Sequence, residues 1–120
     1  MDGVACTRVG GVPVNGNTNN LHPDLMDILQ RLEARMGFEL TVTSGQRGHD
    51  HNVEVGGVPD SEHTYDPAKG ADVLCKQSIT RYKMVQWLLQ HGVTRIGIGN
   101  EFIHVGIADD KPQYVIWDYY

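Results

Sequence analysis

Apolar residues between positions 23 and 36 recur at the three- and four-residue intervals of an amphipathic helix. Pro23 suits the first helical turn, and Gly37 suits the C-terminal cap. His22 precedes this turn, and we interpret it as a weak N-terminal cap. Five residues form the expected apolar stripe: Leu25, Ile28, Leu29, Leu32 and Met36. The pattern therefore predicts a first helix over residues 23–36.

A second helix is predicted to begin at Ser78, whose side chain we interpret as the N-terminal cap. The helix is expected to end at His91, because Gly92 is a typical stop. Its expected buried stripe has four members: Tyr82, Val85, Leu88 and Leu89.

Short apolar or alternating runs predict five strands, over residues 38–43, 71–75, 94–98, 102–107 and 114–117. Gly99-Asn100 joins the third and fourth of these as a hairpin. The lead segment 1–20 is interpreted as extended and rich in turns. Because helices and strands do not alternate strictly, the predicted fold class is α+β, with a small, mostly antiparallel sheet and two main helices packed against it.

Residues 45–70 are rich in Gly, His, Asp and Pro and show no strong periodicity, apart from a short helix that we allow at 52–55. A segment this long without regular structure is usually functional or disordered. This segment is therefore expected to contribute functional residues.

The chain has 120 residues, which predicts one domain over 1–120. Hydrophobic residues make up 40% and charged residues 21%, as in ordinary globular proteins. The net charge of −5 and the lack of a Lys/Arg run argue against a nucleic-acid partner. No apolar stretch is long enough for a membrane span, and we expect a monomer. The unusual counts are 14 glycines and 6 histidines.

Two cysteines, Cys6 and Cys75, are too few for a disulfide framework. We interpret them as free buried thiols and leave a pairing between them open. The N-terminal 20 residues lack the pattern of a signal peptide. The protein would then act in the cytoplasm, or, if encoded by a phage or made with a leader that is later removed, at the cell wall.

Two ionisable residues interrupt apolar strands. Asp72 opens one predicted strand, and His104 lies in the middle of another. An ionised carboxylate in such a place needs a partner or a metal. With His63 from the polar segment, these residues form the usual ligand set of catalytic zinc, which leaves one position open for water. The alternative is a hydrogen-bonded core histidine, because no short ligand motif is present.

Glu101 precedes His104 by three residues, and positions three apart in a regular strand face opposite sides. Glu101 reaches the same site only from a turn or bulge after Gly99-Asn100. There it would act as general base and then as the acid for a leaving amine; otherwise it is a solvated turn residue. Arg47 would stabilise an oxyanion or bind a substrate carboxylate, or it is an ordinary surface arginine.

Five short motifs occur in one order within residues 22–107, and each is weak alone. They are Ser44-Gly45-Gln46-Arg47, His51-Asn52 with Val55-Gly56-Gly57, Ser61-Glu62-His63, Gly70-Ala71-Asp72 and Glu101-Phe102-Ile103-His104. Together they resemble the zinc D-Ala-D-Ala carboxypeptidase family, which includes vancomycin-resistance D,D-peptidases and phage L-alanyl-D-glutamate endolysins. This family shares its fold with the hedgehog signalling domain, and the resemblance implies the same fold here.

The resemblance also implies roles for individual residues. His63, Asp72 and His104 match the ligands of one Zn²⁺ ion. Glu101 matches the catalytic base, and Arg47 matches the residue that stabilises the substrate carbonyl as it becomes tetrahedral.

Three further matched positions complete the implied site. Ser61 matches a serine that contacts substrate, while we interpret His51 and Asn52 as structural. The implied activity is hydrolysis of peptidoglycan stem peptides by a zinc-bound water that Glu101 activates, in a D,D-carboxypeptidase or an L-Ala-D-Glu endopeptidase. The alternatives are a non-catalytic, zinc-stabilised binding module of the same fold and a metal-free structural protein.

The chain departs from the family pattern at two places. Asp72 follows His63 by nine residues, where the family usually has seven, so Asp66 inside this insertion is a rival ligand. We prefer Asp72, because Gly-Ala-Asp before an apolar strand matches the family. The family often has His-Val-Asp at the last motif, and here Gly106 replaces the acid.

Overall fold

The first helix forms where the apolar spacing predicts it. The computed structural model describes residues 14–46 and 61–119. Helix α1 spans Pro23–Met36, the Nδ1 atom of His22 accepts a hydrogen bond from the backbone N–H of Asp24, and Gly37 closes the helix with φ of 82°. The prediction of α1 and its caps is confirmed. The fully buried members of the stripe are Leu25, Leu29 and Leu32.

The second helix, α3, spans Ser78–Gln90, but its cap and its buried face differ from those predicted. Gln77 is the N-cap residue and makes no side-chain capping bond. Tyr82 is 70% exposed and Leu89 is 52% exposed. The buried residues are Met84, Trp87 and Leu88. Met84, Trp87 and Leu88 lie at helical spacing and define the face that packs inward. The predicted buried face was therefore wrong, because it is rotated about the helix axis from the observed one and shares only Leu88 with it.

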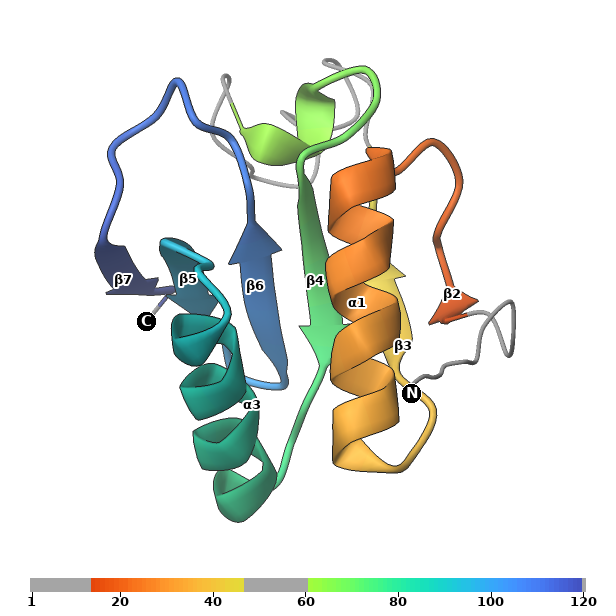
Figure 1. Ribbon diagram of the computed structural model, residues 1–120, viewed down its shortest axis with the longest axis vertical. Helices are drawn as coiled ribbons and strands as arrows, with labels where there is room; N and C mark the ends of the chain where they lie inside the picture. Colours follow the sequence, from red (N-terminus) through yellow and green to blue (C-terminus); the bar gives the residue numbers. More distant parts are fainter. Residues whose placement is uncertain (1–13, 47–60, 120) are drawn as a thin grey trace.

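The strands form one six-stranded sheet in the order β2-β3-β4-β6-β5-β7 (Figure 1). Pairs β3/β4, β4/β6 and β5/β6 are antiparallel, whereas β2/β3 and β5/β7 are parallel. The bounds are β2 Asn15–Gly16, β3 Thr41–Ser44, β4 Gly70–Leu74, β5 Arg95–Ile98, β6 Phe102–Gly106 and β7 Val115–Asp118.

The sheet is therefore mixed, and the prediction of a mostly antiparallel sheet was wrong. Strand β7 follows β6 and runs back in the opposite direction, but it lies outside β5 and not beside β6. A strand antiparallel to β6 is necessarily parallel to β5, because β5 and β6 form a hairpin. The predicted α+β class and the two helices are confirmed.

Helices α1 and α3 cover one face of the sheet (Figure 1). Successive side chains of a strand point to opposite faces, and the helix-side positions are apolar and at most 1% exposed: Val42, Ala71, Val73, Ile96, Ile103 and Val105. These residues share one core with the buried residues of both helices. The intervening positions, including Asp72 and His104, point to the other face.

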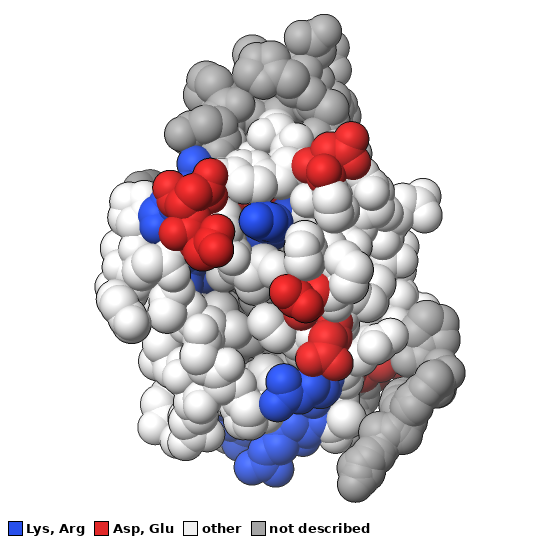
Figure 2. Space-filling view, turned by 45° about the horizontal axis from the view of Figure 1, so that its top comes forward, with Lys and Arg blue, Asp and Glu red and all other residues white. Residues whose placement is uncertain are grey.

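The face seen in Figure 2 carries charges of both signs. The largest group of Lys and Arg side chains lies at the foot of the view, and acidic groups lie above it with a few more basic side chains beside and between them. Among the described residues on this face there is thus no continuous basic surface. None of the helices in the described ranges is long and apolar enough to cross a membrane.

Candidate metal centre

Three elements bring His63, Asp72 and His104 together. His63 belongs to the short 3-10 helix η1, Glu62–Thr64. Asp72 lies at the centre of β4, and its direct cross-strand partner in β6 is His104. Because direct partners point to the same face of a sheet, the register alone sets Asp72 beside His104. Helix η1 then supplies His63 from above the start of β4.

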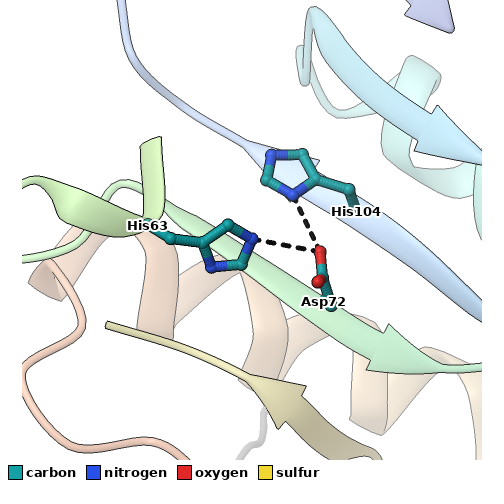
Figure 3. Close-up of side chains that lie close together, drawn as sticks. All are labelled: His63, Asp72 and His104. Carbon is teal, nitrogen blue, oxygen red and sulfur yellow. Dashed lines mark hydrogen bonds and ion pairs between the residues drawn. The ribbon is translucent and has the colours of Figure 1, made fainter. Parts of the chain in front are cut away.

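The three side chains converge on the Oδ1 atom of Asp72. This oxygen lies 3.2 Å from Nε2 of His63 and 2.9 Å from Nδ1 of His104, and both rings are directed at it (Figure 3). One ligand atom from each residue lies within 4.8 Å of the others. The residues are 3%, 6% and 2% exposed. The geometry therefore provides a compact, buried group of metal-ligating atoms.

The opposite nitrogen of each ring is held by a group that can only accept a hydrogen bond. Nδ1 of His63 donates to the carbonyl oxygen of Gly45 at 2.7 Å, and Nε2 of His104 donates to the Glu62 carboxylate at 2.8 Å. In the neutral rings the protons sit on these nitrogens, so a lone pair of each ring faces the Asp72 carboxylate. Three electron pairs facing one point fit a bound cation.

Burial and hydrogen bonding act against each other on the charges of this site. Burial alone would raise the pKa of Asp72, but hydrogen bonds from His104 and His63 outweigh it and lower this pKa to about 2. Burial alone would lower the pKa of His104, but hydrogen bonds to Asp72 and Glu62 raise it above its usual value. Both shifts favour the charged forms, a protonated His104 beside an ionised Asp72, so a metal bound here would compete with that proton.

Sequence reasoning missed the buried Glu62 carboxylate beside His104 and the partly buried Arg95 that pairs with it. The Glu62 carboxylate accepts hydrogen bonds from His104 and from the backbone N–H of Ala108, and it forms an ion pair with Nε of Arg95 at 3.0 Å. The Arg95 guanidinium lies over the Trp117 ring, 5.1 Å from its centroid. The only sequence signal was that Glu62 directly precedes a predicted ligand.

Ser61 and Asp66 lie on either side of η1. The Oγ atom of Ser61 accepts a hydrogen bond from the backbone N–H of His63 and caps η1. Asp66 is exposed and accepts a hydrogen bond from the Asn20 side chain at 2.7 Å. The two-residue insertion is therefore directed away from the histidines, and Asp72, not Asp66, lies beside them.

The other predicted site residues are not brought to this group by the described structure. Glu101 is exposed in the bend before β6, and its backbone oxygen accepts a hydrogen bond from the N–H of Cys75. Its carboxylate forms no hydrogen bond or ion pair with another described residue. Several predictions fall outside the described residues: Arg47, His51, Asn52, the short helix at 52–55 and Cys6. Cys75 is a buried free thiol.

The chain belongs to the Peptidase M15 family, the family of zinc D-Ala-D-Ala carboxypeptidases, whose model matches residues 3–106. This confirms the resemblance found in the five motifs. No curated protein and no solved structure matches the chain. Family membership and the His/Asp/His group together indicate a metallopeptidase.

Proposed function

We propose that the protein is a zinc-dependent metallopeptidase of the hedgehog/D,D-peptidase fold that hydrolyses peptide bonds in peptidoglycan stem peptides. It would act as a D,D-carboxypeptidase or as an L-Ala-D-Glu endopeptidase. The observation that carries the proposal is the convergence of His63 Nε2, Asp72 Oδ1 and His104 Nδ1, with the other nitrogen of each ring held by an acceptor. Membership of the M15 family supports the substrate class.

Zinc is the metal that this donor set fits best. Two imidazole nitrogens and one carboxylate oxygen are a usual set for catalytic zinc, which leaves a position open. When bound, zinc supplies Lewis acidity to a peptide carbonyl and makes water more acidic. The chain fixes its ligands in advance, since Gly45 and Glu62 hold the protonated nitrogens of the two rings.

Three residues carry the remaining roles in this proposal. Glu101 takes a proton from the attacking water and delivers it to the departing amine. Arg47 holds the carbonyl oxygen of the substrate as negative charge develops on it. Because Ser61 Oγ already accepts the N–H of His63, its own hydrogen is the group that would donate to the substrate.

The test combines metal analysis with digestion of defined muropeptides. We expect one zinc ion per chain and, by mass spectrometry, a single type of stem-peptide bond cut, with activity lost on chelation and restored by zinc. A protein that holds zinc and leaves stem peptides and purified sacculi intact would contradict the peptidase. The identity of the cut bond separates carboxypeptidase from endopeptidase action.

A zinc-stabilised binding module without catalysis is the second candidate, and the position of Glu101 favours it. The Glu101 carboxylate is exposed, contacts no other described charge, and belongs to the bend before β6, three residues before His104. For catalysis it must reach the metal group from the β5–β6 turn. Glu101→Gln separates the candidates. A peptidase loses turnover and keeps zinc, whereas a binding module retains both its zinc and its affinity for sacculi.

A further inference from the structure

Both carboxylate oxygens of Glu62 are paired, next to the metal group formed by His63, Asp72 and His104. Its Oε1 accepts from Nε2 of His104 at 2.8 Å, and its Oε2 lies 3.0 Å from both the N–H of Ala108 and Nε of Arg95. The Glu62 side chain is only 2% exposed. A buried carboxylate is tolerated when its oxygens are paired in this way.

The space for Glu62 is made by two glycines that lie side by side in neighbouring strands. Gly70 of β4 and Gly106 of β6 are direct register partners. A Cβ atom at Gly70 would lie 2.7 Å from Cβ of Glu62 and 2.8 Å from Cε1 of His104, which is too close. A Cβ atom at Gly106 would overlap the Glu62 carboxylate itself. The sequence around the site is thus adapted to this one side chain.

Gly106 is also the place where the chain departs from the His-Val-Asp pattern. The pattern would place an Asp side chain at position 106, and Gly106 has none. The Glu62 carboxylate occupies the space next to the Gly106 backbone where that side chain would start. Glu62 reaches it from η1, and Arg95 provides the opposite charge. An acid is therefore still present next to His104, but a different element supplies it.

We propose that Glu62 is a positioning residue that holds the His104 ring with Nδ1 directed at the metal, in the place of the acid that position 106 lacks. The inference rests on the proposed metal site. A hydrogen bond to the outer nitrogen of a histidine ligand fixes its tautomer and orientation, and loss of such a partner typically lowers metal affinity by about 10- to 100-fold.

Zinc affinity is measured by competition with a chromophoric chelator for the wild type, Glu62→Ala and Glu62→Gln. We expect Glu62→Ala to bind zinc about 10- to 100-fold more weakly. Glu62→Gln retains an acceptor oxygen and should lose less affinity. The matched control is Glu33→Gln, because the Glu33 carboxylate is also buried but accepts from the backbone N–H of Leu40. This control should bind zinc like the wild type.

Two further measurements separate positioning from general support of the fold. In ¹⁵N-edited NMR of the zinc-loaded wild type, the Nε2 proton of His104 should be protected from exchange, and Glu62→Ala should lose that protection. The double variant Glu62→Ala/Gly106→Asp should recover much of the zinc affinity, because it returns an acid to the same space.

Wild-type zinc affinity in both Glu62 variants would overturn the proposal, and so would an unprotected Nε2 proton in the wild type. Failure of the double variant to recover affinity would overturn the claim that positions 62 and 106 share one space. A wild type that binds zinc but cuts no stem peptide leaves this inference intact and contradicts only the peptidase.

Discussion

The two faces of the sheet are buried by different means, although the same strands build them. On the helix side, Ile103 and Val73 are fully buried against apolar neighbours. On the other face, their sequence neighbours His104 and Asp72 are almost as deeply buried, but among charges and hydrogen bonds. The first face stabilises the fold by removing apolar surface from water. The second holds polar groups in fixed directions, which is what a metal site requires.

The largest effect is expected from His104→Ala on the polar face. The substitution removes a proposed ligand and leaves the carboxylates of Asp72 and Glu62 without their shared partner. Zinc affinity should fall by more than about 100-fold, since this exceeds the loss of a residue that only supports a ligand. Isothermal titration with zinc measures it. Zinc affinity equal to that of the wild type in this variant would show that His104 is not a ligand.

The neighbouring substitution Ile103→Ala tests the other face in the same strand. It removes a fully buried side chain from the core, and such substitutions lower the free energy of unfolding by about 2–5 kcal/mol. Zinc affinity of the folded protein should stay within about threefold of the wild type, because Ile103 points away from the metal group. Urea unfolding and zinc titration distinguish the two effects. A large loss of zinc affinity here would mean that the faces are not independent.

Removal of the metal should destabilise the protein through the polar face alone. A ligand that binds only the folded state at 100 times its Kd stabilises it by about 2.7 kcal/mol. We expect the melting temperature to fall on chelation in the wild type and in Ile103→Ala, but not in His104→Ala. Differential scanning calorimetry with and without chelator provides the comparison, and an equal fall in all three proteins would point to an effect of the chelator itself.

Above pH 6.5, the stability of the metal-free protein and its affinity for zinc should change in opposite directions. The raised pKa of His104 stabilises the metal-free fold below the unfolded value of 6.5, and this contribution is lost as the pH rises through the folded pKa. The lowered pKa of Asp72 contributes above 3.8 and is lost as the pH falls towards about 2. Chelated protein should therefore become less stable above pH 6.5.

Zinc affinity should rise over the same interval, because the ligands must release protons to bind metal. Denaturant unfolding in chelator and zinc titrations at matched pH values measure the two trends. Parallel trends would contradict the competition between metal and proton.

Local signals were sufficient to predict α1 but not the buried face of α3. In α1, Pro23, Gly37 and the leucine stripe all lie within the helix or at its ends, so no distant residue was needed. In α3, two overlapping apolar stripes are present, and packing against α1 and the sheet selected Met84 and Trp87. The strand at β7 was predicted, but its parallel pairing with β5 was not, because the neighbour of this strand depends on the path of the whole chain.

The members of the His63/Asp72/His104 group could be predicted from the sequence, whereas the contact of His104 with Glu62 could not. Asp72 and His104 stand out because each interrupts an apolar strand. Glu62 contacts partners 42 and 46 residues away, and its space depends on glycines in two strands. Contacts between residues so far apart in the sequence cannot be predicted from a local sequence pattern. The predicted base, Glu101, stays a prediction for the same reason, since a turn does not fix the direction of an exposed carboxylate.

Anomalous diffraction at the zinc absorption edge, from crystals grown with zinc, tests the metal centre most directly. The expected result is one strong peak at about 2.0–2.2 Å from His63 Nε2, Asp72 Oδ1 and His104 Nδ1, with Glu62 still bonded to the outer nitrogen of His104. A peak at other side chains, or coordination through Nε2 of His104 with Glu62 displaced, would contradict this account.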